Sequence, residues 1–220
     1  GNWRTPFNPR ASNHRNDDYC EGTAWQWTWF VPHDVDGLVE LMGGRDAFIG
    51  KLDSLFTADS KLEGESTSVD ISGLIGQYAH GNEPSHHIAH LYNYVGQPWR
   101  TQEIVDEVLH TLYFNNPDGL SGNEDCGQMS AWYILNAMGF YQVCPGKPVY
   151  SIGRPLFNEA TVHLKDGKSF KVIAHNNSRD NKYVRSIVLN GNKLETPFFT
   201  HQDIVDGGTL ELTMGSEPLK

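Results

Sequence analysis

The sequence predicts a mainly α protein that ends in a small antiparallel β unit. Apolar residues recur at helical spacing before about residue 140, whereas alternating residues and two-residue turns follow Pro145. Helices followed by strands favour an α+β arrangement over a parallel α/β sheet. The 220 residues suffice for one large domain or two small ones. We therefore predict a helical region at 1–144 and a β unit at 145–220.

Start and stop signals delimit the expected helices. The pair Gly43-Gly44 separates the first two, Pro84 opens the third, Thr101 caps the fourth, and Gly139 ends the last. The expected helices cover 34–41, 46–56, 84–94, 101–112 and 128–138.

Two hairpins and a final strand are expected in the β unit. The dipeptides Asp166-Gly167 and Asn190-Gly191 are typical of hairpin turns between short apolar runs. The expected strands cover 161–164, 169–173, 186–189, 193–194 and 208–214.

Composition excludes several classes of function. The chain has 27 acidic and 17 basic residues, a net charge of −10, which disfavours nucleic-acid binding and a cleft for an anionic polysaccharide. No apolar run approaches the roughly 20 residues of a membrane-spanning helix. Three cysteines are too few for a disulfide framework. Six Trp and nine Tyr lie often beside acids and amides, a pattern suited to stacking on sugars.

Three loops at 15–22, 80–87 and 116–128 combine glycine with carboxylates and amides. Glu21 precedes a Trp-rich segment, and enclosure by indoles would raise its pKa, as a general acid requires. Glu124 and Asp125 lie in a Gly-rich turn before a helix, where backbone N–H groups keep a carboxylate ionised, as a base requires. Such a pair is the minimum for glycoside hydrolysis. The alternative for Glu21 is an ordinary acidic residue in the first turn of a helix, and the alternative for Asp125 is a plain N-cap.

Four histidines at 80, 86, 87 and 90 do not form the HExxH pattern of a zinc protease. The oxygen donors of Asn82, Glu83, Asn123 and Asp125 suit Ca²⁺ better, although they match no EF-hand. Histidines that bind sugar hydroxyls or support the loop are the alternatives.

The loop motifs resemble those of glycoside hydrolase family 92, a family of exo-acting α-mannosidases common in gut Bacteroidetes. The resemblance covers essentially the whole chain. It is carried by the segments 20–29 (CEGTAWQWTW), 81–87 (GNEPSHH), 97–101 (QPWRT) and 122–133 (GNEDCGQMSAWY), and it continues through 153–157, 190–191, 207–210 and 214–216.

The resemblance implies part of an (α/α)6 barrel followed by the β region, and Ca²⁺-dependent, inverting hydrolysis of terminal α-mannosides in glycans. By motif position Glu21 is the general acid and Asp125 the general base, with Glu124 as a helper. Glu83 lines the leaving-group side of the pocket. The remaining substrate-binding residues are Trp25, Gln26, Asn82, His86, His87 and Trp99. The calcium ligands are expected at Asn82, Glu83 and Asp125.

Two departures from the family matter. Asn82 stands where α-1,2-specific members carry His, which leaves α-1,3 or another linkage open. Family members are also roughly three times as long, so we expect this chain to lack the N-terminal part of the protein. We expect it to be nearly inactive alone, and to self-associate or derive from a truncated parent. The resemblance implies a periplasmic, cell-surface or secreted location. The alternative function is a non-catalytic carbohydrate-binding or scaffold piece with structural carboxylates.

Overall fold

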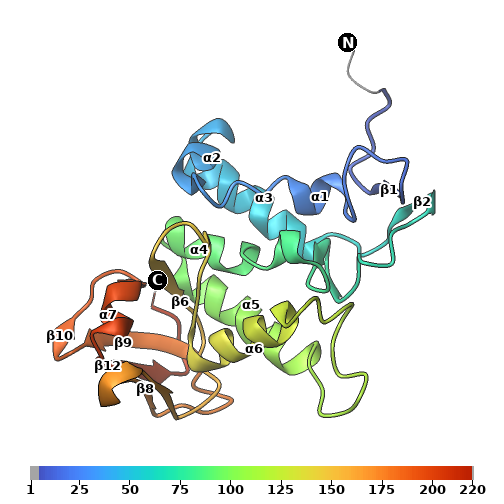
Figure 1. Cartoon of the computed structure of the whole chain (residues 1–220). Coiled ribbons are helices and arrows are strands. Elements are labelled where there is room, and N and C mark those ends of the chain that lie inside the picture. Colours follow the sequence, from blue (N-terminus) through green and yellow to red (C-terminus); the bar gives the residue numbers. More distant parts are fainter. Residues whose placement is uncertain (1–4, 220) are drawn as a thin grey trace.

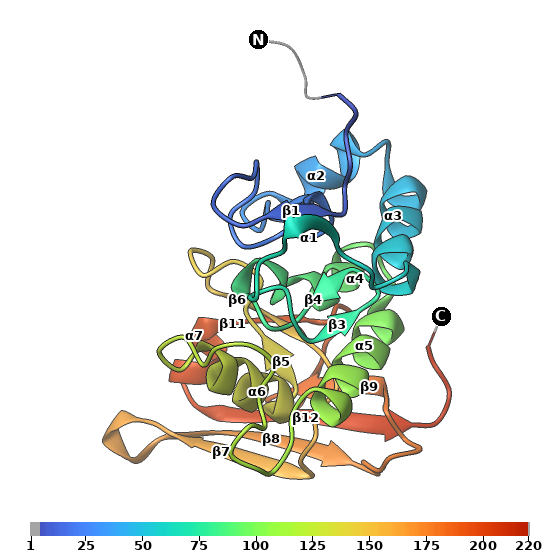
Figure 2. The same cartoon turned by 90° about the vertical axis from the view of Figure 1, so that its right-hand side faces the viewer.

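The computed structural model describes residues 5–219 and contains a helical part followed by a β unit (Figure 1). The helical part carries the predicted site loops, and the sheet of the β unit runs beneath it in the view of Figure 2. The elements of the helical part, in chain order, are β1 (Ala11–Asn13), α1 (Ala24–Trp27), α2 (Val35–Leu41), α3 (Arg45–Thr57), β2 (Glu63–Ser66), β3 (Leu74–Ile75), β4 (Tyr78–Ala79), two 3-10 turns (Glu83–Ser85 and Ile88–His90), α4 (Leu91–Tyr94), α5 (Pro98–Thr111) and α6 (Gln128–Met138).

Three of the expected helices are confirmed. Asp34 caps α2 by accepting a hydrogen bond from the Gly37 N–H at 3.0 Å. The helix expected at 46–56 is α3, which follows Gly44 at φ 98°. The helix expected at 128–138 is α6, and Gly139 ends it in the left-handed conformation that glycine adopts without strain.

The continuous helix expected at 84–94 is wrong. The segment forms two 3-10 turns and then the single turn of α4, because three histidines along it bond to partners on different elements. Thr101 is also not a cap. Helix α5 begins at Pro98, where a missing N–H costs nothing, and Thr101 is buried inside the helix.

The β unit has a mixed sheet, so the prediction of a purely antiparallel region is wrong. Strands β7 and β8 form the first expected hairpin, and β9 and β10 form the second. Strand β12, however, pairs in parallel with β8 and antiparallel with β9. The sheet order is β10-β9-β12-β8-β7, and a second sheet has the order β11-β6-β5. The remaining bounds are β5 (Phe140–Tyr141), β6 (Val149–Ile152), β7 (Glu159–His163), a 3-10 turn (Lys165–Gly167), β8 (Ser169–His175), β9 (Tyr183–Leu189), β10 (Asn192–Lys193), β11 (Phe198–Thr200), α7 (His201–Val205) and β12 (Gly208–Gly215).

Two hydrophobic clusters correspond to the two parts. One contains buried residues of α2 to α6, with Trp29, Phe48 and Trp132 fully enclosed. The other lies between the sheets and α7, with Phe170 and Leu210 at its centre. The domain boundary expected at residue 144 stays a prediction. The strand β5, which belongs to the sheet β11-β6-β5, already begins at Phe140.

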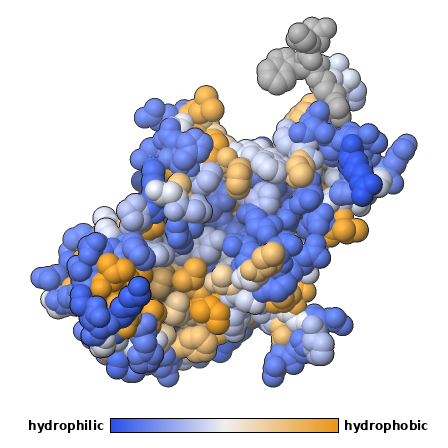
Figure 3. All heavy atoms as spheres, viewed as in Figure 1, coloured by the Kyte–Doolittle hydropathy of each residue, from blue (hydrophilic) through white to orange (hydrophobic). Residues whose placement is uncertain are grey.

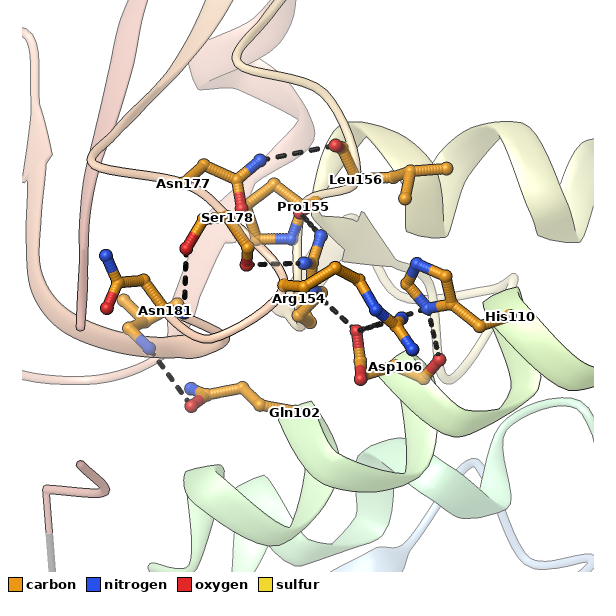
Figure 4. Close-up of polar contacts among 11 residues, drawn as sticks. Gln102, Asp106, His110, Arg154, Pro155, Leu156, Asn177, Ser178 and Asn181 are labelled. Atoms are coloured by element: carbon orange, nitrogen blue, oxygen red, sulfur yellow. Dashed lines mark hydrogen bonds and ion pairs between the residues drawn. The ribbon is translucent and has the colours of Figure 1, made fainter. Parts of the chain in front are cut away.

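A buried ion pair joins α5 to the β unit (Figure 4). Arg154 is 2% exposed, and its Nε lies 2.9 Å from Asp106 Oδ1 on α5. The same carboxylate lies 3.2 Å from His110 Nδ1 and 3.8 Å from Arg179. Arg154 also donates to the carbonyl of Ser178 at 3.1 Å. The loop 153–157 is therefore tied to α5 and to the strand connection at 176–182.

Large apolar side chains remain at the surface, and Figure 3 shows hydrophobic residues in several places on one face. Those of the helical part include Phe30, Leu41, Phe114 and Ile134, with exposed fractions of 45%, 85%, 58% and 51%. Within residues 5–219 no helix is both long and apolar enough to cross a membrane.

Candidate active site

Glu83 is the residue around which the predicted carboxylates gather. It is half-buried at the start of a 3-10 turn after β4. Burial raises its pKa, and the negative charges of Asp125 and Glu21, with a side-chain hydrogen bond to Asp125, raise it further, while its own backbone opposes the shift. The three loops therefore bring Glu21 and Asp125 within electrostatic reach of Glu83. The catalytic roles expected for Glu21 and Asp125 stay predictions.

Asn82 links two of these carboxylate residues. Its side-chain Nδ2 donates to the carbonyl of Glu21 at 2.9 Å, and its Oδ1 accepts from the N–H of Glu83 at 3.2 Å. The side chain is 6% exposed. A single buried amide therefore fixes the spacing of the Glu21 and Glu83 backbones.

Glu21 lies in a left-handed turn with φ 51°, a conformation that costs a non-glycine residue free energy. The indole of Trp27 holds this turn, because its Nε1 donates to the carbonyl of Cys20 at 2.8 Å. A Cβ at Gly22 would lie 2.7 Å from that indole, so only glycine fits there. The expected enclosure of Glu21 by indoles is wrong: its side chain is exposed, and Trp29 is buried in the core.

Asp125 also lies in a left-handed turn. Asp125, Cys126 and Gly127 have φ values of 49°, 56° and 98°. Gly81 and Gly122 bring this loop against the Asn82–Glu83 step, since a Cβ on Gly122 would lie 2.5 Å from the carbonyl oxygen of Gly81. Both outer carboxylates of the cluster are thus presented by strained turns, a frequent property of functional sites.

The helper predicted beside Asp125 has a different position. Glu124 Oε1 accepts a hydrogen bond from the Ser130 N–H at 3.1 Å, which caps the first turn of α6. Glu124 is exposed, and among the influences on Glu83 it does not appear beside Asp125 and Glu21.

The predicted substrate residues fall into two groups. Glu83 and Asn82 lie in the cluster, whereas Gln26 is 1% exposed and bonds within the protein to Thr23 and Gln77. The ring of Trp25 packs beside the ammonium of Lys51 on α3, with 4.6 Å from Nζ to the ring centroid.

The expected role of Trp99 in the substrate site stays a prediction. Trp99 lies in the first turn of α5, whereas Tyr113, just beyond the last turn, contacts His80. A rise of 1.5 Å per residue places these two ends about 20 Å apart.

The histidines are structural in their contacts. His86 and His87 are 2% and 4% exposed, and their Nε2 atoms lie 2.9 Å and 2.7 Å from the carbonyls of His80 and Trp29. Burial lowers the pKa of each to about 4, so both are neutral at pH 7. This matches the alternative of loop support.

The fit of the cluster to Ca²⁺ rests on its donors. Asn82, Glu83 and Asp125 each carry a side-chain oxygen that can bind a hard cation. Burial raises the pKa of Glu83 and the negative charges of Asp125 and Glu21 raise it further, and a divalent cation would neutralise that negative charge. Within residues 5–219 no three acidic, His or Cys side chains lie close enough to hold an ion by themselves. The donor chemistry fits calcium, which takes six to eight oxygens, with further ligands from water or other groups.

Gln128 was not among the site residues that the sequence predicted. This first residue of α6 contacts His86 and Tyr141 through its side-chain nitrogen, at 3.0 Å and 3.3 Å. The sequence held one signal for this residue: Gln128 follows Asp125 by the same number of positions as His86 follows Glu83.

Three loops place the half-buried carboxyl group of Glu83 under the influence of the two exposed carboxylates of Glu21 and Asp125. A pair of carboxyl groups is the minimum that glycoside hydrolysis requires. The glycosyl hydrolase family 92 catalytic domain matches residues 1–216, and the chain belongs to that family.

Similar proteins agree with this assignment. A family GH92 alpha-mannosidase from Bacteroides thetaiotaomicron has a TM-score of 0.87 and 42% identity over 99% of this chain and 28% of its own. A family GH92 inverting mannosidase from the same organism has a TM-score of 0.84 and 43% identity over 99% of this chain and 30% of its own. An uncharacterized secreted glycosidase from Arthroderma benhamiae is 32% identical over 90% of this chain and 24% of its own length. The chain thus spans less than a third of each relative.

Proposed function

We propose that this chain is the C-terminal portion of the catalytic region of a longer exo-α-mannosidase, which hydrolyses terminal α-linked mannose in glycans. The observation that carries the proposal is the convergence of Glu21, Glu83 and Asp125 in a chain of family 92. The similar inverting mannosidase supports a reaction with inversion. The helical part then corresponds to about half of an (α/α)6 barrel.

In an inverting reaction, Glu21 would protonate the glycosidic oxygen and Asp125 would take a proton from the attacking water. Inversion needs carboxyl groups roughly 6.5–9.5 Å apart, which leaves room for that water. Glu83 is a second candidate for the acid, because its pKa is the one that burial and its neighbours raise.

Aryl α-mannosides distinguish these two acids. Removal of a general acid slows a poor leaving group far more than an activated dinitrophenyl leaving group, which needs no proton. If Glu21 is the acid, Glu21→Gln keeps activity on the dinitrophenyl mannoside and loses it on mannobiose, whereas Glu83→Gln loses both. The opposite pattern would assign the proton to Glu83.

We propose that calcium binds at Asn82, Glu83 and Asp125. When bound, the ion would supply positive charge to the mannose hydroxyls and so help to distort the ring. The chain's own residues set the geometry: Asn82 spaces Glu21 and Glu83, and the glycine contact at 81 and 122 holds Asp125 beside them.

The first experiment is hydrolysis of α-1,2-, α-1,3- and α-1,6-mannobiose by the full-length enzyme, with and without EDTA, beside Glu21→Gln. We expect calcium-dependent release of mannose that collapses in the variant. The preferred disaccharide shows which linkage accompanies Asn82. We propose that the enzyme cleaves an α-1,3 or other linkage rather than strictly α-1,2. Release that is indifferent to EDTA and to Glu21 would contradict the proposal.

The carboxylates of Glu21 and Asp125 are exposed in this chain, whereas glycosidase subsites are concave. We therefore propose that the 220 residues alone are nearly inactive, and that the remaining part of the protein walls the site. The alternative is a carbohydrate-binding piece with structural carboxylates, of which Glu124 at the start of α6 is an example. The secreted relative supports an extracellular, periplasmic or surface location.

A further inference from the structure

Two short turns, each beginning at a carboxylate residue, run through the site. The N–H of His86 bonds to the carbonyl of Glu83 at 3.0 Å, and the N–H of Gln128 bonds to the carbonyl of Asp125 at 3.2 Å. In each turn the third residue after the carboxylate points its side chain toward the other turn. The contact is between Gln128 Nε2 and His86 Nδ1, at 3.0 Å.

The direction of this hydrogen bond is fixed by the surroundings of His86. Its Nε2 lies 2.9 Å from the carbonyl of His80, which can only accept, so Nε2 carries the proton and Nδ1 has a lone pair. Gln128 must therefore present its amide nitrogen. The same nitrogen lies 3.3 Å from the hydroxyl of Tyr141, so both amide hydrogens have partners.

His86 is a rigid anchor for such a contact. It is 2% exposed, and the Trp132 indole of α6 donates to its carbonyl at 2.9 Å. His80, which accepts from His86, is itself held between the hydroxyls of Tyr78 and Tyr113, at 2.8 Å and 2.7 Å. The anchor thus belongs to a buried polar network whose atoms are satisfied, an arrangement that specifies one geometry.

The turn at Asp125 needs an anchor. Residues 125–127 are all left-handed, and the N-cap of α6 is Gly127, which has no side chain to hold the helix start. The loop around this turn is held by the Gly81–Gly122 approach, by the hydrogen bond from Asn123 Nδ2 to Asp70 Oδ1 at 3.2 Å and by the bonds of Glu124. The side chain of Gln128 adds the contact that ties the Asp125 turn to the Glu83 turn through His86.

We propose that Gln128 and His86 are positioning residues that set the distance and orientation of Asp125 relative to Glu83. This inference rests on the proposed function, because it assumes that the two carboxylates act on one substrate. A misplacement of about 1 Å in such a pair lowers the rate by roughly 10²-fold.

The test is Gln128→Glu in the full-length enzyme. The substitution keeps the shape but replaces the donor nitrogen by an oxygen that faces the lone pair of His86 Nδ1. Gln102→Glu is the matched control, because Gln102 is a buried amide on α5 that uses its oxygen, accepting from the Val184 N–H at 3.1 Å. Both changes introduce a carboxylate at an amide that is partly or fully buried, so the melting temperature of each variant reports the structural part of the loss.

Two readouts separate positioning from stability. Hydrogen exchange of the Gln128 and Met129 amides should accelerate in Gln128→Glu and stay unchanged in Gln102→Glu. On mannobiose, kcat should fall on the order of 10²-fold in Gln128→Glu with KM within a few-fold, whereas Gln102→Glu keeps kcat. If Gln128→Glu does not fold, Gln128→Met, which lacks a new charge, is measured in the same way.

Unchanged exchange at 128–129 would overturn the inference, as would an unchanged kcat with accelerated exchange. A wild-type enzyme that releases no mannose would instead overturn the proposed function. The exchange measurement would then still decide whether Gln128 holds the turn.

Discussion

Two of the regions in which charged groups gather, one around Asp106 and one around Glu83, have opposite electrostatic environments. Around Asp106, the guanidinium groups of Arg154 and Arg179 lie at 2.9 Å and 3.8 Å, so the buried carboxylate is compensated. Around Glu83, the influences are burial and two more carboxylates, which raise its pKa. A carboxylate with cationic partners links structural elements, whereas a carboxyl group without such partners is a candidate for binding a ligand or exchanging a proton.

The backbone shows the same contrast. The Asp106 carboxylate comes from the regular helix α5, whereas Glu21 and Asp125 lie in left-handed turns that need glycines, an indole and buried amides to hold them. Stability and activity should therefore respond separately to changes in the two regions.

The largest expected effect is on activity, from Asp125→Asn in the full-length enzyme. Loss of a general base lowers kcat by about 10²–10⁴-fold. The exposed side chain packs against little, so the melting temperature should change by only a few degrees. Mannose release from mannobiose measures the first effect and calorimetry the second. Near-normal release would remove Asp125 from the mechanism.

Next comes Arg154→Met at the junction with the β unit. Asp106 would stay buried with only His110 and Arg179 nearby, which costs about 3 kcal/mol of the free energy of unfolding. Urea titration measures this loss. A change below about 1 kcal/mol would show that the pair does not hold the junction.

Acidification should destabilise the helical part through its buried histidines. Burial lowers the pKa of His87 and His90 from 6.5 to about 4 in the folded state. A base with a lowered pKa is protonated first in the unfolded chain, so its stabilisation is present above pH 6.5 and is lost as the pH falls toward 4. At pH 5 each histidine should have lost about 2 kcal/mol.

Unfolding free energies measured between pH 7 and 4 test this, and His90→Gln should reduce the slope by about one proton. A slope that this variant leaves unchanged would show that His90 is not the group responsible.

The smallest effect is expected from Lys193→Met, a surface counterpart of Arg154→Met. Lys193 Nζ lies 2.9 Å from Glu195, but the two side chains are 65% and 77% exposed, so water competes with the pair. We expect less than about 1 kcal/mol by urea titration. A loss as large as that of Arg154→Met would remove the distinction between buried and exposed pairs.

Local signals predicted much of this structure. Gly44 and Gly139 delimit helices as expected, and the Asp166-Gly167 pair joins the strands of a hairpin. The parallel pairing of β8 with β12 was missed because it joins segments far apart in the sequence, which no local period reports.

The site was predicted only in part for the same reason. The mixture of glycine and carboxylates marked all three loops. The indole enclosure of Glu21 failed because Trp29 is buried in the core and Trp27 contacts the backbone of the turn, which leaves the Glu21 side chain exposed. The contact between His86 and Gln128 joins residues 42 positions apart, which no local spacing reports. The sequence of the loops predicts which carboxylates belong to the site, whereas the positions of these carboxylates depend on tertiary hydrogen bonds that the sequence does not reveal.

The most direct test of this contrast removes one charge from each region in the full-length enzyme, by Glu83→Gln and Asp106→Asn. We expect Glu83→Gln to abolish mannose release while the melting temperature stays the same or rises, because a repelled carboxylate is removed. Asp106→Asn should lower the melting temperature and leave kcat of the folded enzyme unchanged. Loss of stability without loss of activity in Glu83→Gln would contradict the account.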